Sequence, residues 1–399
     1  MQTNIPLSSK SDPRIVEAES VLRSCVHCGF CNATCPTYGL LGSELDGPRG
    51  RIYLVKTMLE TGEAGAKTRL HLDRCLTCRS CETTCPSGVQ YGHLADIGRS
   101  MVEKDRPLFE RAYRRLMLAV LPYPKRLKPV LALARFAKPF LPSRLRKKII
   151  PKKDALPFRK TNHARKMLVL EGCVQSLVYP NTNRAAARVL DRAGISLIPG
   201  KGCCGAMHSH MGHDPCDLIR RNIDSWWPHV EQGIEAIVMT ASGCGATVKE
   251  YGTLLKSDPC YAEKAGKIAS IAKDLSEIMA GEDLSPFREA GRGRKVAWQC
   301  PCTLQHGQKL SGLVDSLLEQ CGFELCHVPD SHLCCGSAGT YSLLQPEISR
   351  KLLDNKLVAL KAESPDIIAT ANVGCQMHLA SGTNTPVRHW IELFDQLEE

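Results

Sequence analysis

Two cysteine runs near the N-terminus constrain this chain more than any other feature. The first reads "CVHCGFCNATCP" over residues 25–36, and the second reads "CLTCRSCETTCP" over residues 75–86. Both have the spacing C-x2-C-x2-C-x3-C-P, which is the ligand pattern of a cubane [4Fe-4S] cluster. Three closely spaced thiolates can meet three corners of a cube, and the proline stops the chain from continuing as a helix into the cluster.

The fourth cysteine of each run is expected to bind the cluster of the other run, as it does in two-cluster domains with this spacing. The ligands expected for the first cluster are Cys25, Cys28, Cys31 and Cys85, and those for the second are Cys75, Cys78, Cys81 and Cys35. Zinc is the alternative, because C-x2-C pairs also form tetrahedral zinc sites. Four ligands suffice for zinc, however, which leaves the repeated C-x3-C-P ending without a role.

The segment between the two runs is too long for a compact bacterial ferredoxin. Thirty-nine residues separate Cys35 from Cys75, and "DGPRGRIYLVKTMLE" among them predicts a helix that begins after Pro48. The expected N-terminal domain is therefore a helical one with ferredoxin-type cysteine runs.

The second half of the chain contains an internal repeat, which indicates two domains of one kind. The pairs "MLVLEGC" and "VAWQCPC", two Cys-Cys-Gly triplets, and "AIVMTASGC" and "DIIATANVGC" recur at offsets of 129, 131 and 131 residues. Each copy alternates short apolar strands with helices, which favours a small parallel α/β unit. The repeat cysteines follow predicted strands and are expected to converge at the carboxyl edge of each sheet. They are Cys173, Cys203, Cys204 and Cys244, and then Cys302, Cys334, Cys335 and Cys375.

These eight thiols have three possible roles: further iron-sulfur ligands, a redox-active thiol set, or small buried side chains. The repeated spacing argues against the last, and the sequence does not decide between the other two. The stretch "GKGCCG" at 200–205 also fits the dinucleotide pattern G-x-G-x-x-G. Its counterpart "LCCG" at 333–336 keeps only the cysteines and the final glycine, so the dinucleotide interpretation is a coincidence.

Other candidate ligands have no counterpart across the repeat. His208, His210 and His213 lie in "MHSHMGH", but the second copy has "SAGTYS" there, which favours a polar loop or the start of a helix. The cysteines outside the repeat pattern are expected to pack or to lie at the surface. They are Cys216, Cys260, Cys300, Cys321 and Cys326.

Positive charge is concentrated in one segment. The formal net charge is +11, and residues 125–166 contain fifteen lysines and arginines and one acid. The stretch "VLALARFAKPFL" at 130–141 is apolar between basic residues, which is typical of a segment lying on an anionic membrane surface. A solvated linker is the alternative, and a nucleic-acid partner is not expected because stacking aromatics are few.

The fold class expected is an α+β multidomain chain, with a helical two-cluster domain followed by two parallel-sheet cysteine-rich domains. The N-terminus has no signal-peptide pattern, so a reducing, cytoplasmic location is expected. The expected ranges are 14–105 for the cluster domain, 106–166 for a basic Pro-rich helical linker, 167–260 and 293–385 for the repeats, and 261–292 for a connecting helix.

The combination of these motifs resembles the iron-sulfur subunits of glycolate oxidase, across essentially the whole chain. The stretches "CVHCGFCNATCPTYGLLGSELDGPRGRIYL", "RCLTCRSCETTCPSGV", "PDSHLCCGSAGTY" and "PVRHWIE" carry the resemblance. It implies a non-catalytic subunit of an oxidoreductase complex that oxidises glycolate to glyoxylate. Partner subunits with FAD would take the electrons, and this chain would pass them to a membrane acceptor such as quinone, on the inner face of the cell membrane.

Related groups with the same cysteine triplets leave alternatives open. Iron-sulfur subunits of lactate or anaerobic glycerol-3-phosphate dehydrogenases are similar, and a zinc-stabilised nucleic-acid-binding protein is the alternative from another class. In the related heterodisulfide reductases the last repeat cysteine belongs to a C-x-x-C. Here Thr247 and His378 stand at the second position, so each repeat offers four thiolates, with His378 as a substitute ligand in the second copy only.

Overall fold

The computed structural model describes residues 1–140, 146 and 149–395, and within these the chain forms two compact units. The first unit combines residues 1–117 with two later segments, 207–214 and 332–356. The second contains residues 118–206, 215–331 and the chain from 357 on. Each later segment of the first unit therefore comes from one copy of the sequence repeat.

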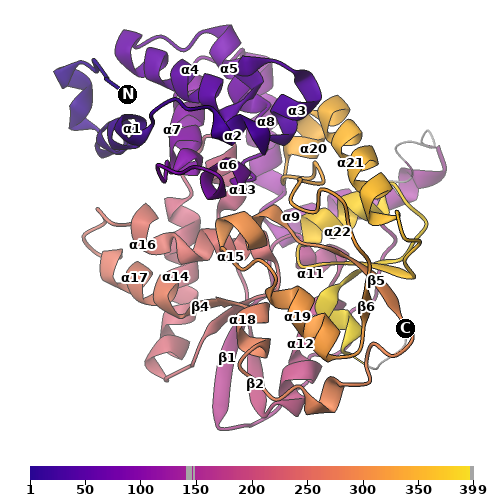
Figure 1. Cartoon of the computed structure of the whole chain (residues 1–399). Helices are drawn as coiled ribbons and strands as arrows, with labels where there is room; N and C mark the ends of the chain where they lie inside the picture. The colour runs from indigo at the N-terminus through magenta and orange to yellow at the C-terminus, as the bar shows by residue number, and fades with distance from the viewer. Residues whose placement is uncertain (141–145, 147–148, 396–399) are drawn as a thin grey trace. The chain divides into compact units, whose positions relative to one another are not determined.

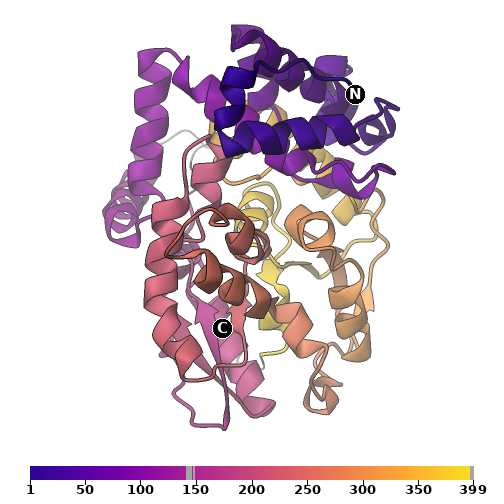
Figure 2. The same cartoon turned by 90° about the vertical axis from the view of Figure 1, so that its left-hand side faces the viewer.

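The first unit is helical, and α1, α4 and α7, indigo to violet in Figures 1 and 2, pack together. Its core contains fully buried Leu22 of α1, Val55 of α4 and Leu94 of α7. Helix α4 begins at Pro48, as predicted, and ends before Gly62 in a left-handed conformation. Its helices are α1 (Pro13–Ser24), α2 (Phe30–Ala33), α3 (Pro36–Leu41), α4 (Pro48–Thr61), α5 (Ala66–Asp73), α6 (Ser80–Thr83), α7 (Tyr91–Lys104) and α8 (Leu108–Val120), with 3-10 turns at Leu7–Ser11 and Glu44–Asp46.

The two later segments of the first unit bond directly to its helices. Arg114 of α8 donates to the Met211 carbonyl at 3.1 Å, and the Tyr341 hydroxyl donates to the Arg74 carbonyl at 3.1 Å. These segments carry α13 (Ala206–His210), α20 (Tyr341–Leu344) and the start of α21 (Pro346–Leu360). The chain that follows each Cys-Cys-Gly triplet is thus part of the wall of the cluster unit.

The second unit contains two parallel sheets, as the repeat predicts (Figure 1), and each has a fourth strand that was not predicted. Their strand orders are β2-β1-β3-β4 and β6-β5-β7-β8, which is the same topology twice. Strands buried on both faces read as continuous apolar runs, and β3 is buried throughout. The strands are β1 (Arg165–Leu170), β2 (Ile195–Gly200), β3 (Ile237–Met239), β4 (Ala272–Asp274), β5 (Lys295–Gln299), β6 (Glu324–Leu325), β7 (Ile367–Thr370) and β8 (Val387–His389).

The prediction of a connecting helix over 261–292 is wrong. Helix α17 ends at Ile271, and the chain then forms β4, which pairs with β3, before α18. The apolar residues of this segment fit a helical period, but pairing with the open edge of β3 buries Ala272 and Asp274 instead. The segment completes the first sheet.

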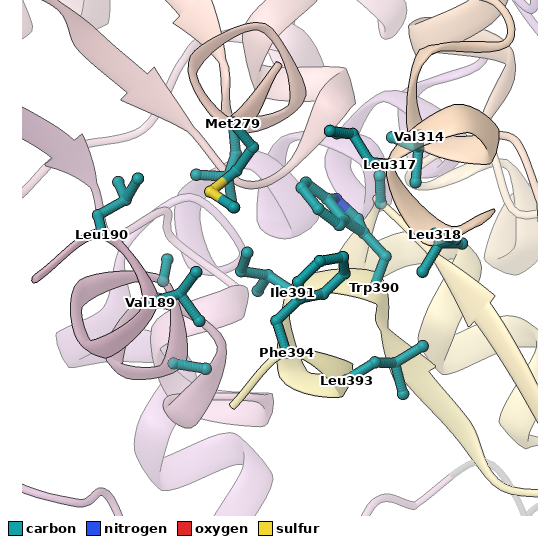
Figure 3. Packing of buried hydrophobic residues seen from close by; sticks show 14 of the residues in the cluster. Val189, Leu190, Met279, Val314, Leu317, Leu318, Trp390, Ile391, Leu393 and Phe394 are labelled. Atoms are coloured by element: carbon teal, nitrogen blue, oxygen red, sulfur yellow. The ribbon is translucent and has the colours of Figure 1, made fainter. Parts of the chain in front are cut away.

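The two sheets share one apolar core inside the second unit. Figure 3 shows Val189 and Leu190 from the first repeat in the same cluster as Trp390 and Phe394 from the second, with Met279 between the two repeats. The remaining helices of the unit surround the sheets. They are α9 (Pro124–Ala137), α11 (Gln175–Val178), α12 (Asn181–Arg192), α14 (Cys216–Glu231), α15 (Ser242–Lys249), α16 (Tyr251–Leu254), α17 (Ala262–Ile271), α18 (Leu275–Met279), α19 (Leu313–Gln320) and α22 (Val373–Ala380), with a π turn at Thr303–Gly307 and 3-10 turns at Lys138–Phe140, Ser285–Phe287 and Trp390–Leu393.

The basic segment is helical in its first part, and α9 and the 3-10 turn after it end at Phe140. Residues 150–163 are described and contain no helix, so the predicted helical linker is wrong for this stretch. Val130, Leu133, Phe136 and Phe140, from α9 and the turn after it, are 49%, 68%, 77% and 84% exposed. Leu141, at the end of the predicted membrane stretch, lies outside the described residues, as do residues 142–145 and 147–148 of the linker. Among the residues that are described, no helix is long and apolar enough to span a bilayer.

Candidate metal centres

The thiols expected to hold the first cluster line one pocket of the first unit. Cys25, Cys28, Cys31 and Cys85 all contribute to its wall, together with Cys81. Burial and the neighbouring thiols of Cys25, Cys85 and Cys28 raise the pKa of Cys31 to about 11. Cys85, from the second cysteine run, therefore lies with the three thiols of the first run, as the crossed arrangement requires.

The thiols expected to hold the second cluster line a separate pocket of the same unit. Cys35, Cys75, Cys78 and Cys81 contribute to its wall. Burial raises the pKa of the Cys81 thiol well above its usual value, and the thiols of Cys78, Cys75 and Cys35 raise it further. The fourth cysteine of the first run thus lies with the second set.

Both cysteine loops have the same backbone conformation. His27 and Gly29 have φ values of 57° and 87°, and Thr77 and Arg79, at the corresponding positions of the second loop, have 54° and 60°. Left-handed conformations cost free energy for residues other than glycine, above all for a β-branched threonine, and they persist at functional sites. The same pair of turns therefore bends each C-x2-C-x2-C loop around its pocket.

The donor set fits a cubane. Eight thiols and no competing carboxylate line the two pockets, and cysteine thiolates are the protein ligands of [4Fe-4S] clusters. In the described ranges, no three His, Cys, Asp or Glu side chains lie close enough together to hold a single metal ion. The thiolates that hold a cubane stand farther apart, because each binds a different iron at its own corner of the cube.

Buried cations and a phenol surround the second set. Arg51 is 1% exposed and donates to the His71 carbonyl at 2.7 Å and to Thr37 Oγ1 at 3.0 Å. Arg99, also buried, donates to the Cys75 carbonyl at 2.5 Å. Tyr91 Oη donates a hydrogen bond to Cys75 Sγ at 3.6 Å. Burial by itself would raise the pKa of the Cys75 thiol, but Arg51 and Arg99 lower it below its usual value.

A buried carboxylate lies beside Arg51, with Asp46 Oδ1 3.7 Å from Arg51 Nη2. Asp46 is 1% exposed, and its oxygens lie 2.8 Å from His71 Nδ1 and 3.0 Å from Arg74 Nη1. The 3-10 turn that carries it directly precedes α4, so the helix predicted between the cysteine runs also positions Arg51. No motif marks these residues in the sequence; the only signal was "DGPRGR", in which the acid and the arginine stand five residues apart.

The four cysteines of the first repeat converge, as predicted. Cys173 follows β1, the pair Cys203 and Cys204 follows β2, and Cys244 lies in the first turn of α15 after β3. A hydrogen bond with Cys203 and burial raise the pKa of Cys173 well above its usual value, and hydrogen bonds with Cys203 and Cys244 do the same for Cys204. The four thiols therefore form one connected set, in which Cys173, Cys203 and Cys204 are buried and Cys244 is half-buried.

The triplet glycines have the conformation that the tight turn requires. Gly205 and Gly336 have φ values of 96° and 87°. A Cβ on Gly205 would lie 2.9 Å from Pro215 Cβ, and one on Gly336 would lie 2.7 Å from the Ser349 carbonyl oxygen. Glycine is thus needed at both positions for its conformation and for space.

The second repeat divides its cysteines between the two compact units. Cys302 and Cys375 follow β5 and β7 and belong to the second unit, whereas Cys334 and Cys335 belong to the segment 332–356 of the first. All four are buried. The Gly336 amide donates to Cys334 Sγ at 3.4 Å.

Two of the histidines after the first triplet lie near carboxylates. His210 Nδ1 lies 3.7 Å from Asp96, and His213 Nε2 lies 3.5 Å from Glu103. Helix α13 begins at Ala206, in agreement with the predicted helix start. Of the cysteines outside the repeat pattern, Cys300, Cys321 and Cys326 are buried, Cys216 is half-buried and Cys260 is exposed.

Comparisons with known proteins place these features in one class. The chain matches the family model "4Fe-4S dicluster domain" over residues 21–89 and the model "Cysteine-rich domain" over 167–249 and 296–380. It is 53% identical to the glycolate oxidase iron-sulfur subunit of Escherichia coli, with the full length of both chains covered. It is 31% identical to the probable glycolate oxidase iron-sulfur subunit of Bacillus subtilis, covering 91% of this chain and 89% of the relative.

Two more distant matches are also informative. Lactate utilization protein A of Bacillus licheniformis is 26% identical over 52% of this chain and 87% of its own length. The crystal structure of a hypothetical protein from Helicobacter pylori superposes with a TM-score of 0.53 at 12% identity, covering 97% of this chain and 73% of that one. The latter likeness concerns the fold alone.

The helical domain with two [4Fe-4S] motifs and the two cysteine-rich domains define an iron-sulfur protein with an electron-transfer role in an oxidoreductase. Within this class, the chain belongs to the family of glycolate oxidase iron-sulfur subunits.

Proposed function

We propose that this chain passes electrons, one at a time, from FAD-containing partner subunits that oxidise glycolate to glyoxylate. Two [4Fe-4S] clusters carry them, the first held by Cys25, Cys28, Cys31 and Cys85 and the second by Cys75, Cys78, Cys81 and Cys35. The acceptor is a quinone of the cell membrane. The observation that supports this proposal most is that the eight thiols line two pockets, each with three cysteines of one run and the fourth cysteine of the other.

The division of work follows from the chemistry of the two cofactor types. Removing a hydride equivalent from a hydroxy acid is flavin chemistry, and iron-sulfur clusters exchange single electrons. The thiol pockets supply a place for clusters, and no residue of this chain is assigned to the oxidation of glycolate. The chain alone is therefore expected to be brown, reducible and inert toward glycolate.

The test compares the chain alone with the reconstituted complex. The chain, prepared anaerobically, is expected to reduce an artificial dye only when the flavoprotein subunits and glycolate are both present. Turnover of glycolate by the chain alone contradicts the proposal, and so does a flavoprotein that cannot reduce the clusters. Lactate and glycerol 3-phosphate, offered to the same complex, separate the proposed substrate from the two alternatives.

The four converging thiols of the first repeat are a candidate for a further cluster or for a redox-active thiol set. An anaerobic iron count distinguishes the two roles. About eight irons per chain correspond to the two cubanes alone, at four irons each. Clearly more iron assigns metal to the cysteine-rich domains, and a variant with Cys204 changed to Ser is then expected to lose only the excess.

We also propose that the basic segment attaches the chain to an anionic membrane. Leu133 and Phe136 are exposed on α9, next to basic residues such as Arg135 and Lys138. A double change of Leu133 and Phe136 to Glu is expected to abolish sedimentation with vesicles containing phosphatidylglycerol. Leu156→Glu, at a residue that is 41% exposed outside the helix, is the matched control. Equal binding of the parent and the double variant contradicts this attachment.

A further inference from the structure

A cavity of the first unit lies against the second cysteine loop. Its volume is about 460 Å³. Cys75, Leu76 and Thr77 line this cavity and also line the pocket of the second thiol set. These three consecutive residues therefore separate the cavity from the thiol pocket. The backbone and thiol of Cys75 would lie between a molecule in the cavity and the second cluster.

We propose that this cavity binds the ring of a quinone and is the place where electrons leave the chain. This inference rests on the proposed function, because it identifies the acceptor site of the same electron path. The cavity volume falls within the usual range of about 300–1,000 Å³ for small-molecule sites.

Arg106 and Arg114, two of the four arginines in the wall, are paired with carboxylates. Arg106 is bonded to Asp73 at 2.5 Å and to Glu103 at 2.5 Å. Arg114 donates to Glu103 at 3.0 Å and to the Met211 carbonyl at 3.1 Å. Carboxylates thus compensate the charges of these two guanidinium groups.

A third arginine is engaged by the cysteine loop itself. Arg99 donates to Thr77 Oγ1 at 2.7 Å and to the Cys75 carbonyl at 2.5 Å. It therefore holds the partition between the cavity and the second thiol set in place.

The rest of the wall has the two kinds of surface that a quinone ring needs. Leu70, Leu76 and Leu344 supply apolar contacts for the ring faces. Tyr113, His210 and Gln345 bring hydroxyl, imidazole and amide groups to the wall, and these can donate hydrogen bonds to the two carbonyl oxygens. The wall is thus mixed, with these apolar side chains next to charged ones such as Arg69 and Glu110.

An exposed apolar helix face leads to this cavity. Phe109, Tyr113 and Leu116 of α8 recur with helical spacing and are 84%, 46% and 61% exposed. Tyr113 belongs both to this face and to the cavity wall. The side chain of Leu70, in the same wall, is 44% exposed. A ligand with an isoprenoid tail can therefore place its ring in the cavity and its tail along α8.

The step balances in electrons and protons. Oxidation of one glycolate by the flavoprotein releases two electrons and two protons, and one quinone takes up two electrons and two protons to become a quinol. The electrons arrive singly, since each cluster carries one. The protons come from water through the hydrogen-bond donors of the wall.

The experiment uses the full-length chain with its clusters and a pair of adjacent substitutions. Leu344→Trp fills the cavity, whereas Leu343→Trp adds the same side chain at a neighbouring position that is 51% exposed and outside the wall. The probe is decylubiquinone, titrated into the dithionite-reduced chain while its reoxidation and the EPR signals of the clusters are followed. Iron content and EPR signals without quinone serve as checks on folding.

The Leu344→Trp variant is expected to need at least about tenfold more quinone for half-maximal reoxidation, and its EPR signals are expected to be insensitive to the quinone. Leu343→Trp is expected to behave like the parent. Should Leu344→Trp lose iron, Leu70→Trp at the cavity mouth replaces it. Equal quinone dependence of parent, pocket variant and control overturns the inference.

A separate readout distinguishes failure of this inference from failure of the proposed function. Glycolate-driven reduction of a water-soluble dye by the complete complex tests the electron path without the cavity. If the dye is reduced but the cavity variants leave quinone reduction unchanged, the quinone site is wrong and the electron-transfer role stands. If even the dye is not reduced, the proposed function itself is wrong.

Discussion

The two cysteine loops of the first unit share a sequence pattern and a backbone conformation but differ in their surroundings. Around the first loop, Cys28 is exposed, and Val26 and Phe30 beside it are 69% and 63% exposed. Around the second loop, Arg51 and Arg99 are buried and lower the pKa of Cys75. The spacing therefore selects the type of cluster, whereas side chains from distant helices determine the environment of each.

The second unit presents a similar contrast between its two copies. The two sheets have the same strand order. In both, the last residue of the fourth strand is the N-cap of the helical element that follows. In the first sheet this residue is Asp274, and in the second it is His389. A duplicated backbone has thus acquired titratable groups of opposite type at one position.

The largest expected effect comes from the crossed ligands. Cys85→Ser, although it lies in the second run, is expected to remove the first cluster and leave the second intact. The loss should be about four irons per chain and one of two EPR signals. Cys260→Ser, at an exposed cysteine outside both runs, is the control and should retain all the iron. Loss of the second cluster instead would show that the ligand sets are not crossed.

The next prediction concerns pH and the contrast between the two sheets. His389 is buried and neutral: its Nε2 lies 2.7 Å from the Thr240 carbonyl, and its Nδ1 accepts from the Ile391 amide. Burial lowers its pKa to about 4. The unfolded chain therefore binds more protons than the folded chain between pH 6.5 and 4, and stability falls as the pH falls through this window.

The expected loss is about 3 kcal/mol between pH 6.5 and 4. It is measured as the difference in unfolding free energy between the parent and His389→Gln, since cluster loss in acid affects both proteins. His327→Gln, at an exposed histidine, is the control. Parallel pH profiles for the parent and His389→Gln would refute the assignment of this histidine.

A third prediction tests the environment of the clusters. A nearby positive charge favours the reduced cluster, which carries one more negative charge. Arg51→Gln is therefore expected to lower the reduction potential of the second cluster by on the order of 50–100 mV. Arg49→Gln, beside the first loop and with a side chain that is 38% exposed, should change the first potential far less because solvent screens its charge. A redox titration followed by EPR measures both reduction potentials. Equal shifts in the two variants would show that burial of the arginine makes no difference to its effect.

The smallest effect concerns the shared loop conformation. Gly29 has a φ of 87°, and a Cβ there would lie 2.7 Å from Arg49 Nη1. Gly29→Ala is expected to destabilise the chain by about 1 kcal/mol in denaturant unfolding. Gly39→Ala lies in α3 with open space around the position, and it should be neutral or stabilising. A stable Gly29→Ala variant would mean that the first loop does not need its left-handed turn.

Much of the fold follows from spacing alone. The cysteine runs indicate the two thiol sets, and the offset of about 131 residues indicates two sheets of one topology. The fourth strand was missed because its copies, "AKDLSEIM" at 272 and "VRHWIELF" at 387, stand at an offset of 115. A search at one constant offset cannot find them, although Glu277 and Glu392 complete the same capping box in both.

The surroundings of the candidate sites could not be predicted from the sequence. Arg51, Arg99 and Asp46 are single residues without a motif, and their importance arises only when α4 and α7 pack beside the second loop. The same holds for the cavity, whose wall combines the loop with residues from α5, α8 and the segment 332–356. These elements are far apart in the sequence, so only tertiary packing brings them together.

The most direct test of this account is a redox titration of the complete chain under anaerobic conditions, with both cluster signals followed by EPR. The account predicts two [4Fe-4S] signals, of which the one abolished by Cys75→Ser has the higher potential because Arg51 and Arg99 surround it. A single signal, or a higher potential for the cluster abolished by Cys25→Ser, would contradict the two crossed ligand sets or the effect assigned to Arg51 and Arg99.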